Sequence, residues 1–406
     1  MFLTLAGPLR YKDFRLFIIG HFISFTGSWI QNTALQWIIY NLHHSTGELG
    51  LFSFLTTFPS IFVTLLSGFI IDRFDRKRLL QILLILALFP PLIMGILVHV
   101  GIYTFWAFVI LSFLATLFSS IDMPLRQVFI SEIVPPQYLT KALSLQASSF
   151  NSARMLGPAI AGFLMQVFSV KVCFFANLIS YLPLLIFTLW IKPYQDFFKK
   201  TEKFHLIKEF TQFVEFLRRN HGISLILMLT ASFTFWATSV IILFPMLTFK
   251  VLHGSSKEFA FLSTGVGIGA ITGALFLFFK KSDIISKPLH LLKAHLLWVI
   301  GLFFLIFSRS FPIYFIASML IGIAFTNFYP VVNSYLQERS PLEMRGRVMS
   351  LFSVAFLGMA PVGQISIGYM VEILNYRVLM LLWGLLCFII NLPLIYLLKE
   401  RKRCLS

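Results

Sequence analysis

The sequence is dominated by long apolar runs, each of the length needed to cross a lipid bilayer and separated by short polar segments. A segment in lipid must satisfy its own backbone hydrogen bonds, which an α-helix does. We therefore predict an all-α membrane protein with twelve transmembrane helices. They cover residues 14–40, 49–71, 79–98, 103–122, 143–167, 171–191, 223–248, 258–279, 288–308, 311–337, 348–371 and 376–398. With 12% charged residues and a mean hydropathy of +0.86, the chain is too apolar for a soluble fold.

The formal net charge of +17 is explained by membrane topology. If the N-terminus is cytoplasmic, the cytoplasmic segments hold 26 of the 33 Lys and Arg residues, whereas the outer loops hold five. The basic residues are scattered among these loops, so we expect the lipid bilayer and not a nucleic acid as partner. The first apolar run is too long for a cleavable signal peptide. We predict an integral membrane protein with both termini in the cytoplasm.

The chain also repeats itself at a constant offset of 206 residues, with residues 129–162 matching residues 335–368 without a gap. Six spans per repeat give two bundles that enter the membrane in the same direction and enclose a shared cavity. We predict two six-helix domains, residues 1–192 and 223–406, joined by a cytoplasmic linker, residues 193–222. An apolar stripe in the linker predicts an amphipathic surface helix: Phe204, Ile207, Phe210, Val214 and Leu217.

The loop after the second span reads GFIIDRFDRKRLL. It resembles the major facilitator superfamily signature G-x-L-x-D-R-x-G-R-[KR] through Gly68, Asp72, Arg73, Arg76 and Lys77. Asp75 replaces the usual glycine, as in the third drug:proton antiporter branch, which includes enterobactin exporters and macrolide efflux pumps. The stretches DMPLRQVFISEIVPP, NSARMLGPAIAG and RGRVMSL resemble the same branch. The resemblance covers nearly the whole chain and implies the major facilitator fold.

In this family the loop holds the cytoplasmic side of the transporter closed. The resemblance implies the same role for the matching residues of this chain. Asp72 would cap the start of the eleventh span, near Arg345 and Arg347. Arg76 would pair with an acid at the cytoplasmic end of the fourth span, where Asp122 is the candidate. The alternative is ordinary positive-inside charge. The predicted cytoplasmic gate comprises Gly68, Asp72, Arg73, Arg76, Asp122, Arg345 and Arg347.

Arg154 lies about eleven residues into the fifth span, roughly 16 Å from the cytoplasmic boundary at the helical rise. A charge at that depth costs about 2.5–3.5 kcal/mol, so it needs a partner or a wet cavity. Two interpretations remain open. Arg154 either forms a fixed ion pair with Asp122 or, together with Asn151, binds an anionic group of the substrate.

Polar residues also form stripes on apolar spans. His21, Ser24, Ser28 and Gln31 recur at helical spacing on the first span. The seventh and tenth spans carry similar faces. Such a stripe faces either a substrate cavity or another helix. The predicted substrate-binding residues are Arg154, Asn151, Ser28, Gln31, Asn32, Thr234, Asn327 and Asn333.

Gly157, Pro158 and Gly162 resemble the antiporter motif of the fifth span, although Ala153 stands where that motif begins with glycine. The alternative is a small-residue packing face. No carboxylate is expected in the middle of a span. Asp122 and His21 are the proton-coupling candidates, and proton coupling itself rests on the resemblance.

We expect a secondary transporter that exports a small amphiphilic molecule, a siderophore or a drug, by alternating access and with protons as the coupling ion. An importer of a siderophore or other small solute, or a lysophospholipid transporter, is the alternative. A membrane-embedded enzyme is disfavoured because no H-E-x-x-H motif, paired carboxylates or nucleophile elbow is found. No cofactor or metal is expected, since the cysteines lack paired spacing. The chain is expected to be a monomer in a bacterial inner membrane.

Overall fold

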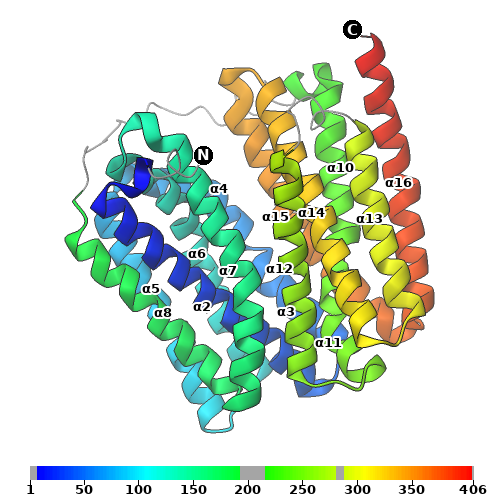
Figure 1. The fold of residues 1–406 in the computed structure, drawn as a ribbon, viewed down its shortest axis with the longest axis horizontal. Helices are drawn as coiled ribbons and strands as arrows, with labels where there is room; N and C mark the ends of the chain where they lie inside the picture. Colours follow the sequence, from blue (N-terminus) through cyan, green and yellow to red (C-terminus); the bar gives the residue numbers. More distant parts are fainter. Residues whose placement is uncertain (1–6, 193–214, 280–287, 405–406) are drawn as a thin grey trace. The chain divides into compact units, whose positions relative to one another are not determined.

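The computed structural model describes residues 7–192, 215–279 and 288–404, and within these ranges the regular structure is entirely helical (Figure 1). The chain divides into two compact units. Unit 1 comprises Met1–Leu42, Leu55–Thr201 and Ser255–Thr264. Unit 2 comprises His43–Phe54, Glu202–Gly254 and Gly265–Ser406. Each unit therefore contains a short segment from the other half of the sequence.

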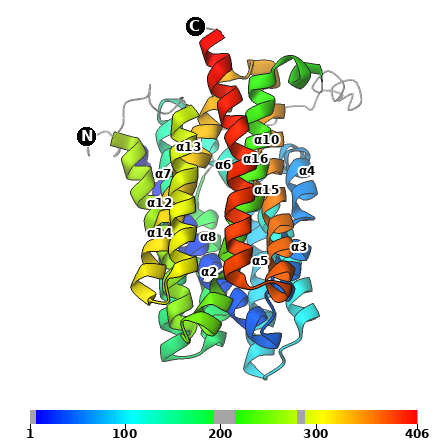
Figure 2. The ribbon, with the colours of Figure 1, turned by 90° about the vertical axis from the view of Figure 1, so that its right-hand side faces the viewer.

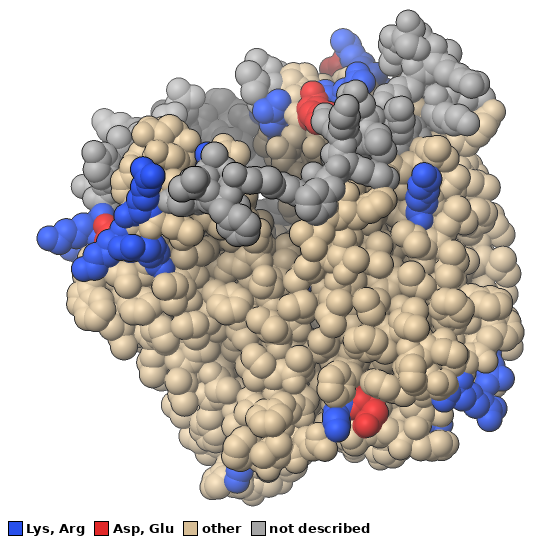
Figure 3. Space-filling view, in the orientation of Figure 1, with Lys and Arg blue, Asp and Glu red and all other residues tan. Residues whose placement is uncertain are grey.

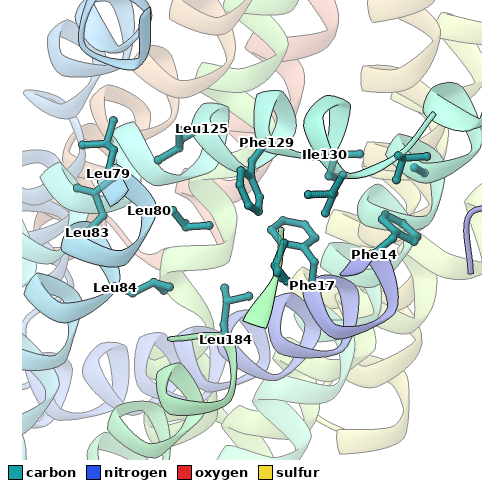
Figure 4. Packing of buried hydrophobic residues seen from close by; sticks show 14 of the residues in the cluster. Phe14, Phe17, Leu79, Leu80, Leu83, Leu84, Leu125, Phe129, Ile130 and Leu184 are labelled. Carbon is teal, nitrogen blue, oxygen red and sulfur yellow. The ribbon is translucent and has the colours of Figure 1, made fainter. Parts of the chain in front are cut away.

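Unit 1 is built from the helices of the first half of the chain. They are α2 (Lys12–His43), α4 (Ser60–Arg73), α5 (Arg76–His99), α6 (Phe105–Ile133), α7 (Leu139–Val167) and α8 (Val170–Trp190), with the short 3-10 helix η1 (Pro136–Tyr138) before α7. Its core lies where α2, α5, α6 and α8 meet, as Phe17, Leu80, Phe129 and Leu184 show in Figure 4. This packing fixes the faces of α2 and α6 against each other.

Unit 2 is built mainly from the second half (Figure 2). Its elements are α3 (Thr46–Thr57), α10 (His221–Ala237), η2 (Thr238–Leu243), α11 (Phe244–Met246), η3 (Leu247–Val251), α12 (Ser256–Phe279), α13 (Pro288–Phe307), α14 (Phe311–Arg339), α15 (Leu342–Ile373) and α16 (Tyr376–Cys404). The first part of α12, up to Thr264, belongs to unit 1. The span that begins with α10 passes through 3-10 and π turns around Pro245, whose ring lacks an N–H group to donate.

Ten helical segments in the described residues are long and apolar enough to cross a membrane. Helices α2 and α7, of 32 and 29 residues, are also long enough, but their polar side chains lower their hydropathy. The all-α membrane fold is confirmed, and the count of twelve spans is compatible with this structure. Large apolar side chains lie exposed along the helices, for example Phe163 at 61% and Ile389 at 62%, as expected of surfaces that face lipid tails.

The structure keeps the internal repeat. Helices α6 and α14 begin at Phe105 and Phe311 and end at Ile133 and Arg339, which preserves the offset of 206 residues at both ends. Helices α8 and α16 begin at Val170 and Tyr376, with the same offset. The two halves of the sequence thus fold into matching elements.

Figure 3 shows a broad face without charged side chains, and the charged side chains in this view gather near the ends of the helices. This distribution is typical of a protein whose middle is surrounded by hydrocarbon. Most of the predicted linker helix, including Phe204, Ile207, Phe210 and Val214, lies outside the described residues.

Candidate functional site

A buried arginine in unit 1 is the centre of a charged cluster in the interior. Arg126, on α6, is 1% exposed. Its Nε lies 2.8 Å from Oδ2 and 2.9 Å from Oδ1 of Asp122, one helical turn earlier. Its Nη1 donates to Ser24 Oγ at 2.9 Å and lies 3.3 Å from His21 Nδ1. The guanidinium also lies 5.0 Å from the centre of the Phe25 ring.

These contacts explain how a full charge is tolerated inside the bundle. A buried guanidinium is costly unless a carboxylate and further hydrogen bonds compensate it. Asp122 supplies the charge, and α2 supplies the remaining partners. Among the described atoms, His21 Nε2 is buried and has no hydrogen-bond partner. We name the set His21, Ser24, Asp122 and Arg126 the Arg126 cluster.

The predicted fourth span ends at residue 122, before Arg126. Helix α6 continues to Ile133, so Asp122 and Arg126 lie within it. The physical reason is that an acid and a base four residues apart neutralise each other on one helix face. Their spacing is the signal that could have identified the pair.

Polar contacts between α2 and α8 continue from this cluster. Ser28 Oγ lies 3.1 Å from the Tyr181 hydroxyl oxygen. The side-chain amide of Asn177 donates to Gln31 Oε1 at 2.8 Å. Ser28 and Gln31 therefore bond to another helix in this structure, which is the alternative to a substrate cavity for this polar stripe. Asn32 is exposed, and its Oδ1 accepts a hydrogen bond from Gln36 at 2.9 Å.

Arg154, on α7, does not form the expected pair with Asp122, because that carboxylate is held by Arg126. The Arg154 Nε is buried and has no hydrogen-bond partner within the described part of the chain. Asn151 donates to the carbonyl of Ala147 on its own helix, at 2.9 Å. The ion-pair interpretation of Arg154 is therefore wrong. Binding of a substrate anion stays a prediction.

Arg76 also has a different partner from the expected Asp122. Its Nη1 lies 2.5 Å from Glu132 Oε1, and its Nη2 lies 3.8 Å from Asp72. The extension of α6 explains the difference, because it carries Glu132 to the N-terminus of α5. Asp75, at the position of the family's glycine, caps α5 by accepting the Arg78 backbone N–H at 2.7 Å.

The other predicted gate residues lie at helix ends. Asp72 and Arg73 are exposed in the last turn of α4, and a Cβ added at Gly68 would meet no described atom within 4 Å. Near the start of α15, Arg345 Nε is buried and has no partner in the described residues, and Arg347 Nη1 lies 3.7 Å from Met344 Sδ. The gate role of these residues stays a prediction.

The antiporter-like residues serve close packing in this structure. A Cβ added at Gly157 would lie 2.3 Å from the Cβ of Trp29 on α2. At Gly162 it would lie 2.5 Å from the Cβ of Ala260 on α12. Pro158 is buried between them. These contacts are those of a small-residue packing face, the alternative to the antiporter motif.

In unit 2 the predicted polar residues also have side-chain partners. Thr234 Oγ1 lies 3.0 Å from the Tyr329 hydroxyl, and Asn327 Oδ1 lies 3.0 Å from His290 Nε2. Asn333 accepts a hydrogen bond from Gln337 at 2.6 Å. In the described residues, no three His, Cys, Asp or Glu side chains are grouped as metal ligands would be.

Comparisons with known proteins agree with this architecture. The chain is 26% identical over 363 residues to the staphyloferrin A transporter of Staphylococcus aureus, covering 86% of this chain and 87% of that protein. It is 22% identical over 400 residues to macrolide efflux protein A of Streptococcus pyogenes, covering 95% and 97%. The crystal structure of a D-xylose-proton symporter superposes with a TM-score of 0.74 at 15% identity, covering 93% and 95%.

The family described as transmembrane secretion effector matches residues 4–402, almost the full length. The helical repeat and the fold agree with this match. The chain is a membrane transporter of the major facilitator superfamily, and it belongs to the transmembrane secretion effector family.

Proposed function

We propose that the protein exports a small amphiphilic molecule, a siderophore or a lipophilic drug, and that protons entering through Asp122 and His21 drive the transport. The observation that carries the coupling part is the Arg126 cluster, because it places an acid, a base and an imidazole within hydrogen-bond distance inside a membrane-spanning bundle. Ionisable groups in such a place are costly to keep, which favours a functional role.

The cluster supports coupling through competition for one carboxylate. While Asp122 is ionised, it holds Arg126 against α2. A proton on Asp122 removes the charge that holds Arg126, which weakens the contact between α6 and α2. His21 Nδ1 faces a guanidinium N–H, so the imidazole offers a second place for the proton only after Arg126 has moved away from it. Proton binding would thereby change the packing of unit 1, as alternating access requires.

The substrate class rests on Arg154 and on the relatives. A buried guanidinium nitrogen without a partner in the described residues favours an anionic or carboxylate-bearing ligand. The relatives are named for staphyloferrin A transport and macrolide efflux, which supports siderophores and drugs as the two classes to test. Ser28, Gln31, Asn32, Asn151, Thr234, Asn327 and Asn333 complete the proposed substrate-contacting set.

We also propose the topology and state of the protein. Residues 1–192 and 223–406 form the two six-helix domains, and residues 193–222 link them in the cytoplasm. Both termini are cytoplasmic in a bacterial inner membrane, where the protein works as a monomer and catalyses no covalent chemistry. Labelling of cysteines introduced at positions 43 and 200 tests the topology, because they must react from opposite sides.

Transport into inside-out vesicles tests substrate, direction and coupling together. Vesicles receive siderophores, macrolides or lysophospholipids, with and without an imposed pH gradient. We expect accumulation of an anionic siderophore or a drug only with the gradient. Asp122→Asn should lower gradient-driven transport about tenfold or more, since a hydrogen bond to a charged group is worth about 1.5–3 kcal/mol. Equal accumulation without a gradient would refute proton coupling, and accumulation only in right-side-out vesicles would identify an importer.

Arg154→Ala tests the substrate anion. We expect loss of transport of the anionic substrate with unchanged abundance in the membrane. Arg154→Lys is the matched control, because it keeps the charge and should retain part of the activity. Unchanged transport by Arg154→Ala would exclude Arg154 from binding.

A further inference from the structure

The second span is divided between the two units. Helix α3 ends at Thr57 and α4 begins at Ser60, after Pro59. The segment His43–Phe54 packs in unit 2, whereas the chain from Leu55 onward packs in unit 1. The break between the two helices thus lies close to the point where the span changes unit. Something in unit 2 must hold α3.

A carboxylate on α15 caps the N-terminus of α3. Glu372 Oε1 accepts the Ser45 hydroxyl at 2.6 Å and the Gly47 backbone N–H at 2.9 Å. Ser45 Oγ in turn accepts the Glu48 backbone N–H at 2.9 Å. A negative charge at a helix N-terminus is favourable both as a cap and through the helix dipole.

The same carboxylate is badly placed within its own helix. Glu372 lies in the last turn of α15, where the carbonyl end of the dipole disfavours a negative charge. Its position becomes favourable only when α3 is docked. Docking of α3 therefore stabilises the N-terminus of α3 and also offsets the unfavourable position of Glu372 on α15. This favours two distinct states, docked and undocked.

The backbones of α3 and α15 also lie in direct contact. A Cβ added at Gly50 would lie 2.6 Å from the Gln364 carbonyl oxygen, and one at Gly368 would lie 2.6 Å from the Thr46 carbonyl oxygen. Ser53 donates to the side chain of Gln364. These approaches leave no room for a side chain between the two helices at Gly50 and Gly368.

The repeat-equivalent contact in unit 1 lacks this arrangement and serves as a comparison. There, Gly162 packs against Ala260 at the start of α12, as Gly368 packs against α3. The cap of α12 is local, because Glu258 Oε2 accepts the Ser255 N–H at 2.7 Å and the Ser255 hydroxyl at 2.6 Å. Glu258 therefore caps its own helix, whereas Glu372 ties one helix to another.

We propose that Glu372 is a gating residue, whose carboxylate holds the outer half of the second span on α15 and whose release opens the outer end of the transport path. The outer location of this contact rests on the proposed topology. The contact itself requires neither a substrate nor a proton gradient. On release, residues 43–54 leave unit 2 while α4 stays in unit 1, and residues 55–59 act as the hinge.

The test measures how easily α3 leaves α15 in whole cells without substrate. Leu49 is 1% exposed, so a thiol introduced by Leu49→Cys reports undocking through its reaction with a membrane-impermeant maleimide. Cys173, Cys387 and Cys404 are replaced by Ser. Glu372→Gln should raise the labelling rate about three- to tenfold, the population change expected when one helix cap is lost.

Two further variants keep the result decisive. Ser45→Ala removes the partner on the α3 side and should raise labelling in the same direction. Glu258→Gln, which weakens a local cap, should leave labelling at position 49 unchanged. Equal labelling in the Glu372→Gln and parent proteins, with both at normal membrane abundance, would overturn the proposal, as would an equal rise in Glu258→Gln. A rise in the labelling rate seen only in inside-out vesicles would support the role of Glu372 in holding α3 and would refute the proposed topology.

Discussion

The two halves of the chain share one helical plan but fill equivalent positions with opposite chemistry. The Arg126 cluster residues His21, Asp122 and Arg126 correspond, 206 residues on, to Leu227, Phe328 and Val332. Phe328 and Val332 are fully buried in the core of unit 2. Phe328 packs against Phe233, with 4.1 Å between ring centroids.

The contrast extends to helices α8 and α16. Asn177 and Tyr181 of α8, which bond to α2, correspond to Trp383 and Cys387 of α16. Trp383 Nε1 instead donates to the Trp236 carbonyl oxygen at 2.8 Å. One backbone plan thus supports either a charged network or aromatic packing. We infer that the first half contains the switch and the second half provides a stiffer partner.

The largest expected effect comes from breaking the charged pair. Arg126→Leu leaves the Asp122 carboxylate buried without its counter-charge, which should cost about 3–5 kcal/mol of stability. The midpoint of thermal unfolding in detergent measures this loss. Val332→Leu, at the equivalent position of unit 2, is the comparison: it adds one methylene to an apolar core and should cost less, about 1–3 kcal/mol.

The double variant Asp122→Leu/Arg126→Leu makes the first half resemble the second. It should recover most of the lost stability, because an apolar pair replaces an ion pair of similar volume. Gradient-driven transport should stay absent. Recovery of transport in the double variant would show that coupling lies elsewhere.

A middle-sized effect should be shared by the two halves. Gly157 packs on Trp29, and its equivalent Gly363 packs on Phe235, where an added Cβ would lie 2.1 Å from the carbonyl oxygen. Gly157→Ala and Gly363→Ala should each destabilise by about 1–3 kcal/mol through overpacking. Gly68→Ala, where the space is open, is the stability control. A large loss for one glycine alone would mean that the two packing contacts are not equivalent.

The smallest effect concerns the hydroxyl contacts that both halves retain. Ser28 and Thr234 are equivalent positions, and each lies about 3 Å from a tyrosine hydroxyl, Tyr181 or Tyr329. Ser28→Ala and Thr234→Val should each lower stability by about 1 kcal/mol or less, as measured for hydrogen bonds between membrane helices. Thermal unfolding provides the measurement. If Ser28→Ala alone also impairs transport, the polar stripe of the first half has a role beyond packing.

The sequence by itself determined the fold class, the internal repeat and the membership of the major facilitator superfamily. The fold class follows from the length and spacing of the apolar runs, which α-helices satisfy in lipid, the repeat follows from the constant offset of 206 residues, and the superfamily was indicated by the resemblance of the loop after the second span. The polar stripe on the first span was also visible, because helical periodicity places Ser24, Ser28 and Gln31 on one face.

Only the tertiary structure decided which charges are partners. Asp122 was predicted to pair with Arg76 or Arg154, and neither Arg126 nor Glu132 was considered as a partner. Hydropathy ends a span at the first charges, whereas a self-neutralising pair lets α6 continue for another eleven residues. The choice of partner depends on the rotation and length of neighbouring helices, and those are set by packing between segments far apart in the sequence.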